Sequence, residues 1–241
     1  MSDEPILSRV RAAYEQVADQ LRTAILRGDF PVGERLPREA DLAEMLGVSR
    51  STVREALRVL GSERLVHTTQ GATGGTFIMQ PSLDYLSEFL TRQYQLLSAT
   101  ETVTFDDMVE LRNLLETEAA RLAAIRRTDA ELERLALTVP EPDATLDIDE
   151  RNALNRSFHL TLLELAHNPL LEVSVLPVYT ALDAFSRRSL LSQKDHSEIN
   201  SEHLKILEAV RAGDEARAGK LAHEHLQHLR GISKRVWRGK V

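Results

Sequence analysis

Two short amphipathic segments, separated by Gly47-Val48-Ser49, constrain the fold more than any other part of the sequence. The first runs from Glu39 to Leu46, and the second from Arg50 to about Glu63. Gly47 is suited to end the first helix, and Ser49 is a favourable N-cap for the second. Two helices joined by a turn of three or four residues that contains glycine are typical of a helix-turn-helix.

The flanking residues complete a small domain. Before the two segments, apolar residues recur at helical spacing from Tyr14 to Ile25 and predict a further helix. After them come two short β-prone runs, Leu65–Thr69 and Thr76–Met79, separated by the glycine-rich segment Gly71–Gly75. These runs predict a hairpin, or wing. We therefore expect a winged helix-turn-helix domain over residues 1–80.

The helix expected from Arg50 has two different faces. One is apolar and carries Val53, Ala56, Leu57 and Leu60, whereas the other carries Arg50, Ser51, Arg54 and Arg58. Arginine is well suited to forked contacts with phosphate and guanine. A solvated surface helix is the alternative interpretation, but the preceding helix, the turn and the wing favour nucleic acid.

The net charge of −7 argues by itself against a nucleic-acid partner, because a polyanion repels an acidic protein. The charge is unevenly distributed, however. Residues 1–80 carry 10 Arg, no Lys and 11 acidic residues, whereas residues 81–241 carry 20 basic and 26 acidic residues. Residues 1–80 are therefore close to neutral, and most of the acidic excess belongs to the second part of the chain.

The stretch LPREADLAEMLGVSRSTVREALRVLGSERLVHTTQGATGGTF, from Leu36 to Phe77, resembles the winged helix-turn-helix of the GntR family of bacterial transcription regulators. The resemblance implies a homodimer on double-stranded operator DNA, with recognition helices in successive major grooves and wing tips in the minor groove. Matched position by position, it implies DNA contacts from Arg38, Ser49, Arg50, Ser51, Thr52, Arg54, Gln70 and Gly71.

Beyond Pro81, long amphipathic segments predict an all-α bundle of six or seven helices over residues 81–241, so that the chain is mainly α. This part resembles the FCD ligand-binding domain of the FadR-like branch of the GntR family, which implies effector binding, metal binding and dimerisation. The expected helices are Leu83–Leu97, Phe105–Arg127, Asp129–Leu137, Leu146–His167, Leu170–Leu191, Glu198–Ala212 and Asp214–Ser233.

Three of the eight histidines, His159, His203 and His225, lie in line with apolar residues on three different expected helices, whereas His223 lies on the opposite face. Buried imidazoles need partners, and neutral imidazole is a common ligand of transition metals, so the pattern indicates a divalent metal site. The FCD resemblance implies the same three ligands and adds Asn155. Zinc is the expected ion, with nickel or manganese as alternatives.

Arg112 interrupts an apolar stripe that includes Met108 and Leu115, and a buried guanidinium needs an anionic partner. One interpretation is an ion pair with Glu116, four residues further along the same helix. The other is that Arg112 binds the carboxylate of a small organic-acid effector beside the metal.

We therefore expect a ligand-responsive repressor of a metabolic operon rather than an enzyme. Two alternatives are a metal sensor, in which the ion is the signal, and a hydrolase that uses a His-bound metal, although no motif places a glutamate as its general base. The chain has no cysteine, so thiolate chemistry is excluded. No signal peptide or membrane span is evident in the sequence, and a cytoplasmic location is expected.

Overall fold

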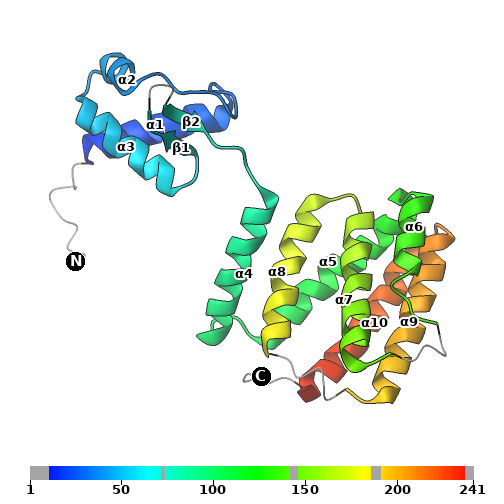
Figure 1. The fold of residues 1–241 in the computed structure, drawn as a ribbon. Helices are drawn as coiled ribbons and strands as arrows, with labels where there is room; N and C mark the ends of the chain where they lie inside the picture. Colours follow the sequence, from blue (N-terminus) through cyan, green and yellow to red (C-terminus); the bar gives the residue numbers. More distant parts are fainter. Residues whose placement is uncertain (1–10, 72–73, 142–145, 186–190, 237–241) are drawn as a thin grey trace, which may run out of the picture. The chain divides into compact units, whose positions relative to one another are not determined.

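The computed structural model describes residues 11–71, 74–141, 146–185 and 191–236. The chain divides into two compact units, of which the first ends at Pro81 and the second begins at Ser82. Among the described residues, helices dominate both units, and the strands form one small antiparallel sheet in the first unit (Figure 1). The prediction of a mainly α fold is confirmed.

The described residues of the first unit form the three helices and the hairpin that the sequence predicts. In chain order they are α1 (Ala13–Arg27), α2 (Glu39–Leu46), α3 (Arg50–Ser62), β1 (Val66–Thr69) and β2 (Gly75–Ile78). A single apolar core joins them, in which Val17 and Leu21 of α1 pack with Val53 and Leu60 of α3.

The turn between α2 and α3 depends on one glycine and one serine. Gly47 ends α2 in the left-handed conformation, with φ of 65°, which is unfavourable for most other residues. Ser49 then caps α3, because its Oγ accepts a hydrogen bond from the backbone N–H of Thr52 at 3.1 Å. The apolar face of α3 is buried in the core, so its arginine face is left exposed.

The hairpin is anchored at its base. Val66 of β1 lies opposite Ile78 of β2, and both side chains are buried in the core of the first unit. Thr69 pairs with Gly75 at the other end of the ladder. Ala72 and Thr73, in the expected glycine-rich turn, lie outside the described residues.

The described part of the second unit contains seven helices, in agreement with the six or seven predicted. The long helix α5 packs against α7, α8, α9 and α10, so the interior of this unit is built around it (Figure 1). The helices are α4 (Leu83–Ala99), α5 (Phe105–Arg126), α6 (Asp129–Ala136), α7 (Ile148–Leu165), α8 (Pro169–Phe185), α9 (Gln193–Arg211) and α10 (Glu215–Val236).

Helix α9 begins at Gln193, five residues before the predicted start at Glu198. Its first turn is polar and shows no apolar stripe, but Ser192 and Asp195 form a capping box there. Helix α8 is described as far as Phe185, and residues 186–190 of the predicted helix, which runs to Leu191, lie outside the described residues.

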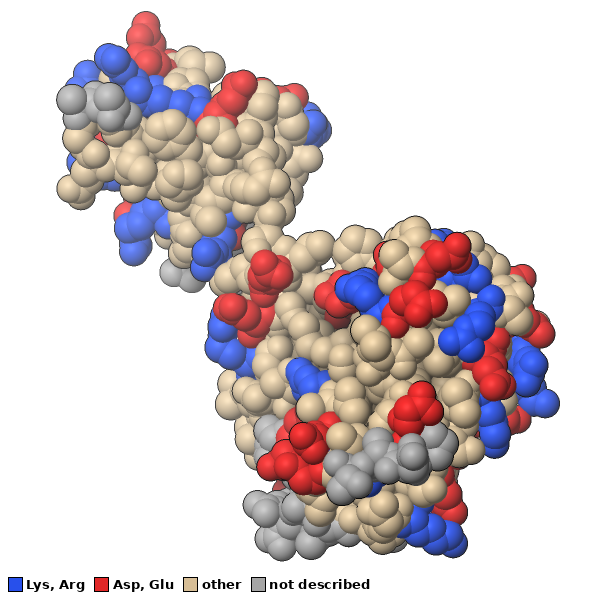
Figure 2. Space-filling model, turned by 45° about the vertical axis from the view of Figure 1, so that its right-hand side comes forward, with Lys and Arg blue, Asp and Glu red and all other residues tan. Residues whose placement is uncertain are grey.

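The surface of the second unit carries both signs of charge. Figure 2 shows acidic and basic side chains interspersed over the visible face of this unit. Among the described helices, none combines the length and the apolar character that crossing a bilayer requires.

Candidate metal centre and DNA-reading surface

The turn before α3 and the exposed face of α3 hold most of the side chains expected at DNA. Thr52 is half-buried beneath the Ser49 cap, and its Oγ1 lies 2.8 Å from Ser49 Oγ. Gln70 and Gly71 follow β1 at the wing and are exposed. The remaining members of the set, all exposed, are Arg38, Ser49, Arg50, Ser51 and Arg54.

The arginines of this face differ in their partners. Arg54 is bound by Glu39 of α2, with Nη2 2.7 Å from Oε2, and Arg58 is paired with Glu55 at 2.7 Å. Arg50 forms no ion pair with any of the described residues. Exposed pairs of this kind contribute little to stability, so phosphate or guanine can replace Glu39 on Arg54 at small cost.

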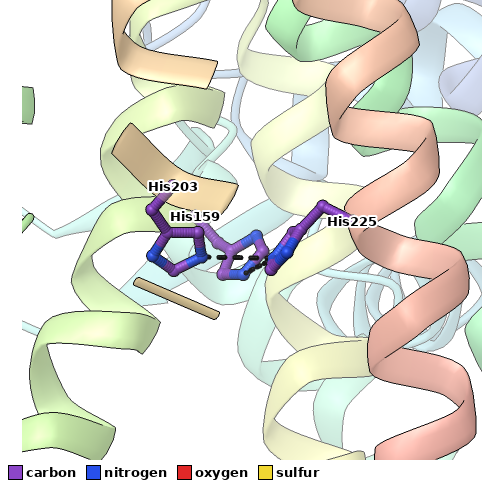
Figure 3. Close-up of side chains that lie close together, drawn as sticks. All are labelled: His159, His203 and His225. Atoms are coloured by element: carbon purple, nitrogen blue, oxygen red, sulfur yellow. Dashed lines mark hydrogen bonds between the residues drawn. The ribbon is translucent and has the colours of Figure 1, made fainter. Parts of the chain in front are cut away.

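Three helices of the second unit bring His159, His203 and His225 together, as Figure 3 shows. His159 lies on α7, His203 on α9 and His225 on α10, and each side chain is almost completely buried. The Nε2 atom of His225 is 3.2 Å from Nε2 of His203 and 3.4 Å from Nε2 of His159. The three rings therefore point the same type of nitrogen at one small volume.

Two carboxylates, the buried Glu116 and the partly exposed Glu202, fix the orientation of two of these rings. His159 Nδ1 lies 2.7 Å from Glu116 of α5, and His225 Nδ1 lies 2.7 Å from Glu202 of α9. When Nδ1–H donates to a carboxylate, the neutral ring is left with a lone pair on Nε2. His203 is held differently, because its ring stacks on Phe158 with 3.9 Å between centroids.

Burial keeps the three imidazoles neutral near pH 7. Desolvation lowers the pKa of His159 to about 4, although Glu116 opposes this shift. Desolvation and the other two rings lower the pKa of His203 well below its usual range, and desolvation also lowers the pKa of His225. Neutral imidazole is the form that binds metal ions.

This arrangement fits a metal ion. Around a tetrahedral zinc ion with Zn–N distances of about 2.0–2.1 Å, neighbouring nitrogens are separated by about 3.3 Å. The Nε2 separations of 3.2 and 3.4 Å match that spacing. Asn155 lies one turn before His159 on α7, and its buried Oδ1 has no hydrogen-bond partner among the described residues. The amide oxygen is therefore available as a fourth ligand.

Arg112 of α5 is buried beside this centre. It forms the ion pair with Glu116 that was one of the two interpretations of its sequence position. Arg112 Nε lies 2.5 Å from Glu116 Oε1, and Nη2 donates to the hydroxyl of Tyr179 of α8 at 2.7 Å. Burial raises the pKa of Glu116, but Arg112 and His159 outweigh this effect and lower it to about 2. Glu116 is therefore an ionised bridge between Arg112 and His159.

Arg112 also lines a small cavity of about 30 Å³ together with Asn155, Tyr179 and His196. A space of this size holds about one or two water molecules. The hydrogen bonds of Arg112 to described residues use Nε and Nη2, and none uses Nη1. The guanidinium therefore keeps donor capacity beside the cavity in addition to its bonds with Glu116 and Tyr179.

Several side chains of this centre were missed at the sequence level. The position of Glu116 on the same helix as Arg112 predicts their ion pair, but it does not predict the contact of Glu116 with His159. Glu202 directly precedes His203, but its bond to His225 depends on how α9 and α10 pack. Tyr179 and His196 gave no usable signal, because only the fold brings them to the cavity.

We expect the metal-free protein to lose stability as the pH falls from about 6.5 towards 4. Over that interval His159 is protonated in the unfolded chain, where its pKa is about 6.5, but stays neutral in the folded protein. The unfolded state then binds more protons, so acidification favours unfolding. Thermal denaturation after EDTA treatment measures the effect. The variant His159→Gln should show a shallower pH dependence, and an unchanged slope would contradict this account.

Comparison with known proteins gives matches to both units. A family model described as "Bacterial regulatory proteins, gntR family" matches residues 13–78, and the FCD domain model matches residues 107–228. The HTH-type transcriptional regulator LutR of Bacillus subtilis (strain 168) is 33% identical, covering 86% of this chain and 95% of its own length. A solved structure, Streptococcus agalactiae GntR, is 31% identical with a TM-score of 0.54 and covers 91% of this chain and 99% of its own.

A protein from Escherichia coli (strain K12), assigned as a regulator of the L-lactate dehydrogenase operon, is 30% identical over 93% of this chain and 88% of its own length. A winged helix-turn-helix followed by an FCD domain defines a class of DNA-binding transcription regulators. This chain belongs to the GntR family and carries the FCD domain. Its relatives are regulators and not enzymes, so the hydrolase alternative is set aside.

Proposed function

We propose that this regulator binds its operator as a homodimer and that a small carboxylic acid, bound beside a metal ion in the helical unit, releases it from DNA. The observation that carries the proposal is the convergence of three Nε2 atoms. Carboxylates hold His159 and His225 with their Nε2 lone pairs facing each other at 3.4 Å, an arrangement that a cation between them stabilises.

The DNA contacts would come from α3, the turn before it and the wing. The contacting residues would be those that the family resemblance implies, namely Arg38, Ser49, Arg50, Ser51, Thr52, Arg54, Gln70 and Gly71. Two such domains in a homodimer bind two half-sites, so each strengthens the binding of the other. A change in their spacing then weakens both contacts together.

Arg50→Ala should reduce operator affinity by about 1–3 kcal/mol if its guanidinium reads a base. The loss of operator affinity in Arg54→Ala should be the same or smaller, because Arg54 has to break its ion pair with Glu39 before it can bind DNA. Fluorescence anisotropy with operator and random DNA at several salt concentrations measures both losses. Lys220→Ala, which removes an exposed cation from α10, serves as the control. Equal losses on both DNAs would assign the arginine to phosphate instead.

The metal would be held by His159, His203, His225 and the Oδ1 of Asn155. We take zinc as the first ion to test, with nickel and manganese as alternatives. When bound, the ion supplies a positive centre that attracts an anionic oxygen. The neutral amide of Asn155 and the three neutral rings add no negative charge in direct contact with the ion, whereas the carboxylates of Glu116 and Glu202 lie behind two of the rings.

The effector would bind through its carboxylate, which Arg112 and the metal-bearing centre both attract. L-lactate is the first acid to test, because one relative is assigned to an L-lactate dehydrogenase operon. The cavity beside Arg112 holds only about one or two water molecules, so even a short acid has to widen it on binding, and a long-chain acid is disfavoured further.

Operator titration in four states tests the proposal: metal-free protein, zinc-loaded protein, and each of these with L-lactate and other short acids. We expect release of the operator only when zinc and an acid are both present. Release by zinc alone, with no effect of any acid, would identify the metal sensor. Identical titrations in all four states would contradict a regulatory role for the centre.

A further inference from the structure

His196, on the first part of α9, has a buried ring nitrogen without a partner. The side chain is only 7% exposed, and its Nε2 forms no hydrogen bond with any residue that the structure describes. Burial and the nearby Arg151 lower its pKa, so the ring is neutral at pH 7. An unpaired polar atom in the interior costs free energy, and such an atom in a native protein calls for an explanation.

The His196 side chain lines the cavity that Arg112 also lines. Part of the remaining wall is apolar and includes Ile199, Leu229 and Ile232. A second small cavity is lined by His196 together with Asn155 and His203. His196 therefore shares cavity walls with Arg112, with Asn155 and His203 of the candidate metal centre, and with apolar side chains.

We propose that His196 is a specificity residue that forms a hydrogen bond with a second oxygen of the effector, next to its carboxylate. The ligand class is a short 2-hydroxy acid, with the carboxylate on Arg112, the hydroxyl on His196 and a small apolar group against Ile199 and Ile232. This inference rests on the proposed function, because it assigns a second recognition point in the same site.

The expected selectivity follows from the burial of His196. A ligand that supplies a hydroxyl satisfies Nε2, whereas a plain carboxylic acid of the same length leaves it unpaired. Sites built to bind a hydroxyl discriminate strongly against analogues that lack it for this reason. L-lactate and propionate are a suitable pair, because they differ only in the 2-hydroxyl group.

The experiment measures binding of both acids to the zinc-loaded full-length protein by isothermal titration calorimetry. Two variants are compared with the wild type: His196→Phe, which keeps a ring of similar size without a hydrogen-bonding atom, and His196→Gln, whose amide can reach the same oxygen. Zinc content and thermal midpoint are recorded for each variant. If His196→Phe does not fold, His196→Leu replaces it as the apolar variant.

We expect the wild type to bind L-lactate at least about 10-fold more tightly than propionate. The apolar variant should lose this preference by weakening L-lactate binding, with propionate changed less than about 2-fold, and His196→Gln should restore part of the difference. L-lactate binding that stays tight in the apolar variant would overturn the role of His196 and leave the proposed function in place. Absence of binding of both acids to the zinc-loaded wild type would overturn both proposals.

Discussion

The double variant His203→Ala, His225→Ala should contain almost no metal, whereas the wild type should contain about one ion per chain. The two changes remove two of the three converging Nε2 atoms and leave His159 with the weak amide donor of Asn155. Loss of a partner that merely supports a ligand already costs 10–100-fold in metal affinity, and loss of two ligands costs more than about 100-fold. Elemental analysis of purified protein measures the content directly.

His223→Ala is the matched control for this experiment. His223 is also on α10, two residues from His225, but its Nδ1 lies 2.7 Å from Asn113 Oδ1 on α5 and does not belong to the converging set. Its replacement should leave the metal content unchanged. Full occupancy in the double variant, or loss of metal in the control, would rule out the site described above.

Arg112→Met should abolish the response of DNA binding to acid. The change removes the guanidinium that is proposed to bind the carboxylate while keeping much of the side-chain volume. The change also removes the ion pair with the buried Glu116, which then keeps only its contact with His159. Breaking a buried ion pair in this way lowers the stability of the protein by about 3–5 kcal/mol. Operator titration with and without L-lactate, together with thermal denaturation, separates the two effects.

Arg112→Lys is the matched variant, because it keeps the positive charge beside Glu116 but loses the planar fork. It should recover most of the stability and little of the response. If Arg112→Met is folded and still releases the operator at the wild-type acid concentration, Arg112 serves only to neutralise Glu116. The ion pair would then be its whole role.

Local signals in the sequence were sufficient for most of the fold. Gly47 and Ser49 specify the turn before α3, and the apolar stripe of α3 determines which face is buried, so this unit followed from spacing alone. The start of α9 could not be predicted from the spacing of apolar residues, because its first turn is stabilised by the capping box of Ser192 and Asp195. Stripes locate the packed part of a helix better than its ends.

The centre could be predicted only in part, for a related reason. The stripes containing His159, His203 and His225 predicted that each ring faces inward, and inward-facing residues of neighbouring helices meet. Which atom of each ring meets the others depends on Glu116 and Glu202, whose contacts cross between helices. Periodicity along one helix carries no information about such contacts.

The continuous contact from Arg112 through Glu116 to His159 has a thermodynamic consequence. If occupation of the guanidinium by an acid changes the affinity of the histidines for metal tenfold, the metal must change the affinity for the acid by the same factor, which is about 1.4 kcal/mol of coupling. The two ligands are then never independent signals. A cell depleted of the metal would then need a higher acid concentration to obtain the same response. The response of this regulator to the acid would therefore depend on the metal concentration in the cell.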